Sequence, residues 1–311
     1  HDPPGSVPSK AVSMSRWISA ILSLVVVLAL RPEWSWAQGP LTRQAVELAQ
    51  DQRFEEAEAI IERALNTAEA GDATAWYVHA FIEKSLFVVR DGRNPDSPSR
   101  LEATRSAMEC ARLDESGELE DKRVALLTFL SDTHLEDARD AIRTSRPGDG
   151  KHAHAHLEAH AAIQLVLDPS WNPEPAAVLL DQMLAEHAFA QAEEQERSGA
   201  GPWFEWGRTC YERAALRGPD RFRSLFNLAV HTYNQGVRQF KASENNLDAV
   251  DSALRDASVL WNLAATGLEQ AIEADSDRAA GYEALAVVSE ALLNRDRVEW
   301  CRTHLAELGG D

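Results

Sequence analysis

One interval pattern occurs twice in the last third of this chain, and it restricts the fold more than any other feature. Small and large residues follow one another at steps of four and three along 207–214 and again along 264–271. The residues are Gly207, Tyr211 and Ala214, then Ala264, Leu268 and Ala271. Residues three and four apart share one face of an α-helix. Each copy therefore predicts a helix whose small residues let a second helix approach closely.

A further helix is predicted after each copy. Pro219 follows the first copy and cannot continue a helix, because it lacks a backbone donor. Asp275 stands just before the equivalent place after the second copy. The next apolar residues then come in register, and they are Leu225, Leu228, Ala229, Tyr282, Leu285 and Ala286. One such helical hairpin cannot bury its apolar face alone, so several must stack.

Both copies, with the residues that follow them, resemble the tetratricopeptide family, whose repeat of roughly 34 residues combines aromatic, Leu-Gly/Ala, small and Pro positions. The resemblance implies a superhelical solenoid that holds other polypeptides. Weaker matches continue it toward the N-terminus at Leu41, Ala45, Leu48, Ala57, Ile61, Ala64, Trp76, Ala80, Ala103, Ala107, Cys110 and Asp114. Residues 117–168 predict two more helices with poor spacing.

The expected fold is therefore all-α, an α–α superhelical solenoid of about six antiparallel hairpins with degenerate middle repeats, over residues 38–311. Strand signals are nearly absent, because the β-branched run 25–27 lies in the first 37 residues and Pro and Gly cluster between helical stretches. A helix is expected to begin directly after Pro202. Core positions are expected for Trp203, Trp206, Trp261, Trp300, Cys110, Cys210 and Cys301.

The first 37 residues resemble an upstream extension and a secretory signal peptide. Met14-Ser15-Arg16 precedes an apolar stretch over 17–30, and Ser35-Trp36-Ala37 offers small residues before a cleavage point. As a helix the apolar stretch would be about 21 Å long, which is short of the ~30 Å hydrocarbon core of a bilayer. We expect cleavage after Ala37, no stable membrane span afterwards, and a periplasmic or secreted protein.

The charge balance excludes some partners. The chain carries a net charge of −19, and the part after residue 37 has 28 basic against 48 acidic side chains. A strongly acidic surface disfavours nucleic acids and anionic lipid, which both need cationic surfaces. Either a cationic partner surface or simple solubility explains the excess of acid.

No arrangement of residues typical of catalysis is present, so we expect a non-enzymatic protein without a cofactor. The sequence has no GxSxG, HExxH or phosphate-binding Gly-rich motif. His152, His156 and His160 are spaced by four and would line one helix face, as zinc, copper or nickel ligands do. The alternative is an exposed, polar helix start after the turn 147–150.

The family resemblance also implies a groove lined by the first helix of each repeat. Groove-facing positions would be Tyr77, Phe81, Lys84, Arg223, Phe226, Asn227, Val230, Tyr233 and Asn234. Exposed rings and Asn amides suit the capture of a peptide. The alternative is that these side chains pack against a neighbouring repeat.

These observations predict an exported, non-enzymatic scaffold that binds a protein or peptide partner in the cell envelope. Two alternatives stay open: a metal-binding helical protein that uses the face of His152, His156 and His160, and an accessory subunit of an envelope assembly.

Overall fold

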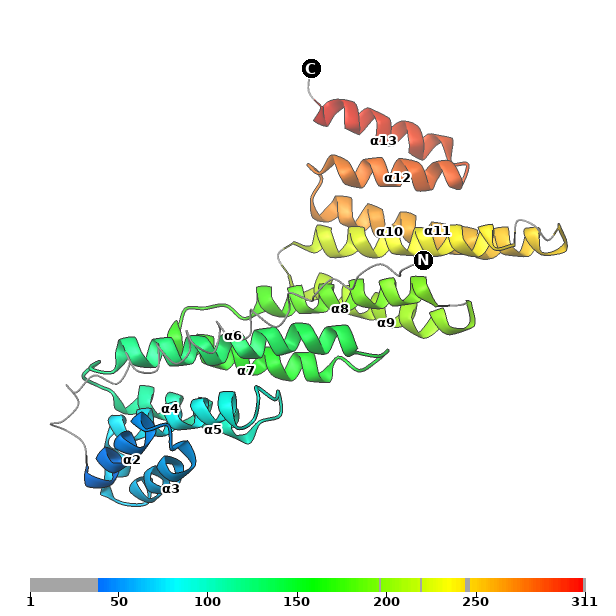
Figure 1. Ribbon diagram of the computed structural model, residues 1–311. Coiled ribbons are helices and arrows are strands. Elements are labelled where there is room, and N and C mark those ends of the chain that lie inside the picture. The colour runs from blue at the N-terminus through cyan, green and yellow to red at the C-terminus, as the bar shows by residue number, and fades with distance from the viewer. Residues whose placement is uncertain (1–38, 196, 219, 244–246, 310–311) are drawn as a thin grey trace, which may run out of the picture. The chain divides into compact units, whose positions relative to one another are not determined.

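The computed structural model of the chain describes residues 39–195, 197–218, 220–243 and 247–309 (Figure 1). These residues form twelve α-helices and one 3₁₀ helix, and they include no strand. The predicted all-α fold is confirmed, and the helices pack mainly against their neighbours in the chain, as in a helical-repeat solenoid. None of these helices is both long and apolar enough to cross a membrane. The predicted leader, residues 1–37, lies outside the described residues.

The chain divides into two compact units, which we describe one at a time. The first unit comprises the chain up to His134 together with 159–170, and the second comprises 135–158 together with the chain from Trp171 onward. Two helices, α6 (Glu120–Thr144) and α7 (Lys151–Leu167), contribute residues to both units. A single repeat domain over 38–311 stays a prediction.

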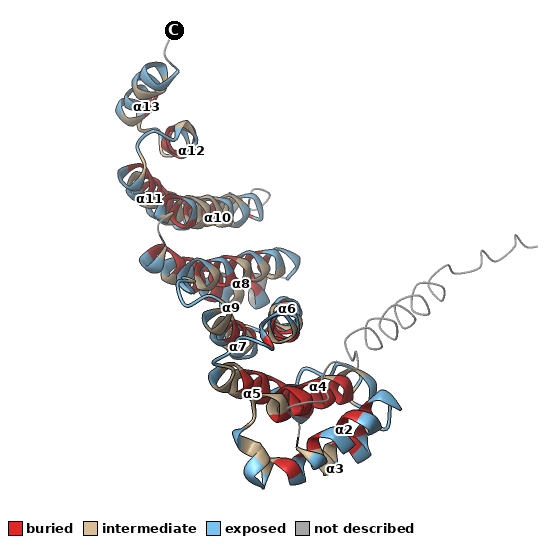
Figure 2. Ribbon diagram, turned by 90° about the vertical axis from the view of Figure 1, so that its left-hand side faces the viewer, coloured by how far each residue is buried: buried red, intermediate tan, exposed pale blue. Residues whose placement is uncertain are grey.

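Four helices of the first unit form two hairpins. They are α2 (Pro40–Gln50), α3 (Phe54–Leu65), α4 (Ala73–Val89) and α5 (Pro98–Leu113), with the 3₁₀ helix η2 (Ala68–Gly71) between α3 and α4. Each of these α-helices packs on the next. The predicted stripes of small residues are buried in these contacts, at Ala45, Ala57, Ala64, Ala103 and Ala107. In Figure 2, α4 is red along most of its length, because α3 and α5 both cover it.

A carboxylate from outside the helix caps the N-terminus of α2. Glu69 in η2 accepts hydrogen bonds from the backbone N–H groups of Leu41 (3.2 Å) and Thr42 (2.9 Å) and from the Thr42 hydroxyl (2.7 Å). The first N–H groups of a helix have no partner within it and carry partial positive charge. Gly39 makes room for this cap, because a Cβ there would lie 2.0 Å from the Glu69 carboxyl carbon.

The second unit continues with three hairpins. Its helices after α7 are α8 (Glu174–Glu194), α9 (Arg197–Arg217), α10 (Arg221–Lys241), α11 (Leu247–Ala274), α12 (Ala279–Ala291) and α13 (Arg295–Leu308). The closest pairs are α8 with α9, α10 with α11 and α12 with α13, while α9–α10 and α11–α12 contacts join the hairpins (Figure 1). The predicted first and second helices of each repeat thus fall on the observed hairpins.

Both copies of the interval pattern lie on second helices of hairpins, the first on α9 and the other on α11. Tyr211, Ala214 and Ala264 are completely buried. The small residue at position 207 is required by close packing, because a Cβ on Gly207 would lie 2.9 Å from the Phe189 ring of α8. Pro219, which was expected to stop the helix, lies outside the described residues.

Two local expectations fail. The helix expected after Pro202 begins earlier, since α9 starts at Arg197 and contains Pro202 in its interior. A proline inside a helix removes one hydrogen bond and crowds the carbonyl four residues earlier, and at position 202 both effects fall on the first turn of α9. Trp300 is 42% exposed and lies beside the rings of Tyr282 and His304 on α12 and α13. The other core expectations hold: Trp206, Trp261 and the three cysteines are buried, and Trp203 is partly buried in the same cluster as Trp206.

Candidate binding groove

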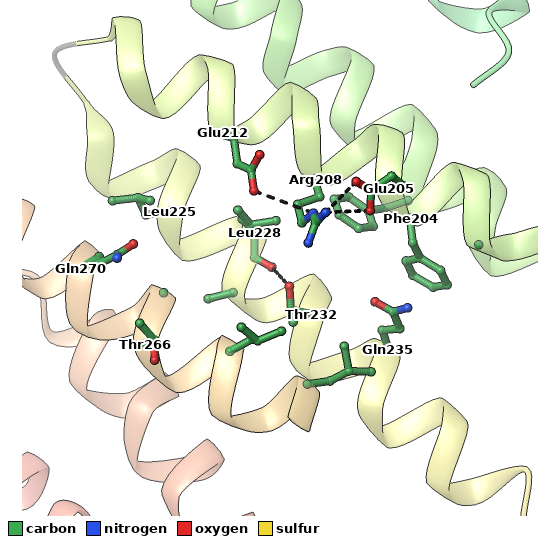
Figure 3. Close-up of a pocket in the computed structure, with 16 residues that line it drawn as sticks. Phe204, Glu205, Arg208, Glu212, Leu225, Leu228, Thr232, Gln235, Thr266 and Gln270 are labelled. Carbon is green, nitrogen blue, oxygen red and sulfur yellow. Dashed lines mark hydrogen bonds and ion pairs between the residues drawn. The ribbon is translucent and has the colours of Figure 1, made fainter. Parts of the chain in front are cut away.

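The second unit has a groove that runs over α10, between α9 and α11. Its volume is about 430 Å³, and residues from all three helices line it (Figure 3). Along α10 each lining residue lies three or four positions from another one, and these residues are Leu225, Leu228, Ala229, Thr232 and Gln235. This spacing keeps them on one face of the helix. The groove is therefore built on a single helical stripe.

The floor of the groove is apolar. Leu225, Leu228 and Ala229 come from α10, and Leu260 and Leu263 come from α11. Leu263 is 55% exposed and Leu228 is half-buried, whereas Leu225 and Ala229 are buried. The two helices come close here because α11 has no side chain at Gly267, where a Cβ would lie 3.2 Å from the Ala229 Cβ. A hollow of this volume with an apolar floor and a few polar groups is typical of a ligand-binding site.

The rim of the groove is polar. On α9, Arg208 lies between Glu205 and Glu212: its Nη2 donates to both Glu205 oxygens (2.6 and 2.8 Å), and its Nε lies 3.8 Å from Glu212 Oε1. Figure 3 shows these side chains in a row along α9, facing Thr232 and Gln235 of α10. Two acids against one base leave this side of the rim with one excess negative charge.

Thr266 and Gln270 of α11 form the opposite side of the rim (Figure 3). The Thr266 hydroxyl donates to the Asn262 carbonyl (3.1 Å), and the Thr232 hydroxyl donates to the Leu228 carbonyl (2.8 Å). The amides of Gln235 and Gln270 make no hydrogen bond within the described part of the chain. These two amides are therefore available to a ligand.

A second hollow of about 280 Å³ continues the groove along α10. Gly201, Phe204 and Gln235 line both hollows. The second hollow follows α10 as far as Ala242, just beyond the end of the helix. The two hollows together thus follow α10 from Leu225 to Ala242.

None of the six groove residues predicted on α10 lines this groove; their face points the opposite way around the helix. Phe226 stacks on Phe222 (ring centroids 5.5 Å apart), and Tyr233 packs against Trp261 of α11. Asn227 donates to the Tyr211 hydroxyl (3.2 Å) and to Glu186 (3.4 Å). The remaining three are Arg223 and Asn234, which are exposed, and Val230, which is half-buried. Much of this face thus serves packing between helices, the alternative that the sequence had left open.

The contacts of Asn227 belong to a polar cluster that joins α8, α9 and α10. Tyr211 donates a short hydrogen bond to Glu186, and His231 Nε2 lies 3.4 Å from the same carboxylate. The hydrogen bonds from His231 and Tyr211 lower the pKa of Glu186 although burial opposes this. The His231 ring lies flat on Phe189, with centroids 4.1 Å apart. Since Phe189 also lines the groove, this cluster supports the groove wall.

The three groove residues predicted on α4 are mostly buried in the first unit. Tyr77 and Phe81 belong to its core, and burial raises the pKa of Tyr77 to about 12. Lys84 is half-buried, with Nζ 4.9 Å from the centre of the Phe129 ring. Burial and the nearby charge of Arg93 lower the pKa of Lys84. Rings that fill a core cannot also capture a peptide.

The three histidines predicted as metal ligands differ in their surroundings on α7. His152 is exposed and His156 is half-buried. His160 is buried, and its Nδ1 lies 2.8 Å from the Ser131 hydroxyl of α6. Among the residues that the structure describes, no group of three or more His, Cys, Asp or Glu is arranged to hold a metal ion. The metal hypothesis thus gains no support, because the third imidazole is already engaged in the core.

His154, which the spacing places off the face of the other three, contacts a buried carboxylate. Asp181 of α8 is completely buried and lies 3.4 Å from His154 Nε2, 2.5 Å from Arg213 Nη2 and 3.8 Å from Arg217 Nη1. Burial opposes ionisation, but the hydrogen bonds from His154 and Arg213 outweigh it and lower the pKa of Asp181. This ion cluster ties α7, α8 and α9 together within the second unit.

No protein-family model matches the chain, and no curated protein matches it. The groove itself is the feature that sequence reasoning missed. One signal could have indicated it: Leu225, Leu228, Thr232 and Gln235 form a stripe that turns from apolar to polar, which is typical of a helix edge that is only partly covered.

Proposed function

We propose that this protein is a non-enzymatic scaffold that holds a polypeptide segment of a partner protein in the groove over α10. The observation that carries the proposal is the combination of a polar rim with an apolar floor that is exposed at Leu263 and half-buried at Leu228. Protein-recognition sites combine an apolar centre, which supplies affinity, with a polar border, which supplies orientation.

The surroundings of the groove support binding rather than chemistry. Its charged lining residues, Glu205, Arg208 and Glu212, are engaged with one another, and its hydroxyls at Thr232 and Thr266 donate to backbone carbonyls. Groups held in this way fit a surface that positions a ligand. We include in the proposal that the protein is a tetratricopeptide-like repeat protein and that it acts after export, on the basis of the interval pattern and of the leader-like residues 14–37.

Site-specific photo-crosslinking tests this function. A benzoylphenylalanine replaces Thr232 in the groove, and a matched variant carries it at Asn234, two residues further along α10 and outside the groove. Irradiation of cells that make the protein naturally should give a discrete adduct from position 232 and none from position 234.

An adduct that forms equally from both positions, or from neither, would contradict the proposed function. The distribution between periplasm and medium, measured by fractionation of the same cells, tests the export part separately. Finding the protein in the cytoplasm with its leader still attached would contradict the proposed export and would leave the groove assignment unaffected.

A further inference from the structure

The walls of the groove restrict the kind of polypeptide that can lie in it. Around the first hollow the walls are the middle parts of α9, α10 and α11, where backbone N–H and C=O groups are already paired along the helix. An extended segment would bring about two unpaired backbone groups per residue into the groove. The available side-chain partners are few, chiefly the amides of Gln235 and Gln270. A helical segment satisfies its own backbone and needs no such partners.

The length of the groove agrees with a helix. From Leu225 to Ala242 the two hollows follow α10 for 17 residue steps, which is about 26 Å at 1.5 Å per residue. A ligand helix of about 17 residues has the same length when it lies along α10. Small residues that line the two hollows, Gly201 and Ala229 among them, leave room for the side chains of such a helix.

The charge of the rim indicates the flanks of that helix. Arg208 neutralises only one of Glu205 and Glu212, and the chain after residue 37 has 28 basic against 48 acidic side chains. In the second hollow Glu193 faces Arg238, so this pair adds no positive excess. Basic residues beside the apolar face of the ligand would be attracted to this surface, whereas acidic ones would be repelled.

We infer that the occupant of the groove is an amphipathic α-helix of a partner protein, with an apolar face and basic flanks, an inference that rests on the proposed function. Its apolar residues lie on the floor formed by Leu225, Leu228 and Leu263, and its basic residues lie beside Glu205 and Glu212.

Three labelled 18-residue peptides test the inference. One consists of Leu and Lys with helical spacing of the leucines, the second has the same composition with strict alternation, and the third has the helical spacing with Glu in place of Lys. We expect the first peptide to bind at least tenfold more tightly than the other two in fluorescence anisotropy. Its circular dichroism signal should also become more helical on binding.

A pair of variants shows whether binding occurs in the groove. Leu228→Asp places a charge on the floor, and Val230→Asp adds the same charge on the other face of α10. We expect Leu228→Asp to weaken binding of the Leu/Lys helical peptide about tenfold or more, and Val230→Asp to change it less than about twofold. Circular dichroism of each variant verifies that it is folded.

The results separate the inference from the function it rests on. Tighter binding of the alternating peptide, lost in Leu228→Asp, would overturn the helical occupant and leave the groove as a polypeptide site. Tighter binding of the Glu peptide would overturn the basic flanks. An equal loss of peptide affinity in Leu228→Asp and Val230→Asp, or no binding of any peptide, would overturn the inference. The crosslinking experiment at Thr232 tests the proposed function independently.

Discussion

At the scale of single residues, glycine controls how closely neighbouring helices approach in the second unit. A Cβ at position 207 would lie 2.9 Å from Phe189, which is closer than side chains normally pack. Gly201 lies on the same helix, and apart from its neighbours in the chain and the backbone of its own helix nothing comes within 4 Å of the place that a Cβ would occupy. The two glycines therefore differ in what a methyl group would meet. The interval pattern identified Gly207 as a packing position, but the partner ring is 18 positions away in the chain and became visible only in the fold.

Exchange of each glycine for alanine should have effects of different size. Gly207→Ala is expected to lower the free energy of unfolding by about 1–3 kcal/mol, because Phe189 must move. Gly201→Ala is expected to change it by less than about 1 kcal/mol, because the methyl group meets no distant side chain and the helix preference of alanine is opposed by Pro202, which follows it. Urea denaturation of both variants measures the difference. Stabilisation by Gly207→Ala would show that Phe189 yields without penalty and would contradict the close contact.

At the scale of secondary-structure elements, the positions of several helices were predictable while the use of their faces was not. Local spacing predicted α9, α10, α11 and α12, because helical periodicity is a property of neighbouring residues. Which face of α10 stays open depends on α9 and α11, whose contacts join distant parts of the chain. A face with rings and amides, such as that of Phe226 and Asn227, is equally suited to a ligand and to a neighbouring helix.

The cap on α2 is another contact between elements, and it predicts a pH dependence. Burial opposes ionisation of Glu69, but hydrogen bonds from Thr42 and Leu41 outweigh it and hold the pKa below the ordinary 4.5. A carboxyl whose folded pKa is lowered contributes stability above its unfolded pKa, and this contribution disappears as the pH falls through the folded pKa. Glu69→Gln should therefore cost about 1 kcal/mol at pH 7, the usual effect of losing a cap.

The same comparison at low pH completes this prediction. Once the pH is well below 4.5, the wild-type carboxyl is protonated, so Glu69→Gln and wild type should unfold at the same urea concentration. Glu47→Gln removes an exposed carboxylate of α2 and serves as the control, with little effect at either pH. A difference for Glu69→Gln that persists at a pH of about 2 would mean that the charged hydrogen bonds are not its source.

At the scale of the whole molecule, the main feature is the excess of negative charge. The chain carries a net charge of −19, and surface ion pairs such as Arg53–Glu56 offset little of the resulting repulsion, because they are exposed and individually weak. An excess of like charge destabilises a compact chain by self-repulsion. Salt reduces this repulsion, since the Debye length falls from about 10 Å at 0.1 M to about 3 Å at 1 M.

We therefore expect sodium chloride to stabilise the protein. Raising it from low salt to about 0.5 M should increase the Tm by roughly 2–4 °C, the change that ~1 kcal/mol produces in a chain of similar size. Circular dichroism melts in sodium and potassium chloride give the test, and the two salts should act alike because screening does not depend on the cation. A Tm that falls with salt would show that attractive ion pairs outweigh the repulsion.

The sequence by itself determined the all-α fold, the order of the hairpins and the small residues at their contacts. These features depend on the spacing of residues within about two helical turns, and spacing over that range can be read directly from the sequence. Only the tertiary structure decided that the groove lies on the face of Leu225 and Leu228, that Glu69 caps α2 and that His160 is held in the core by Ser131. Each of these depends on residues far apart in the chain, whose meeting is set by how whole helices pack and not by any local period.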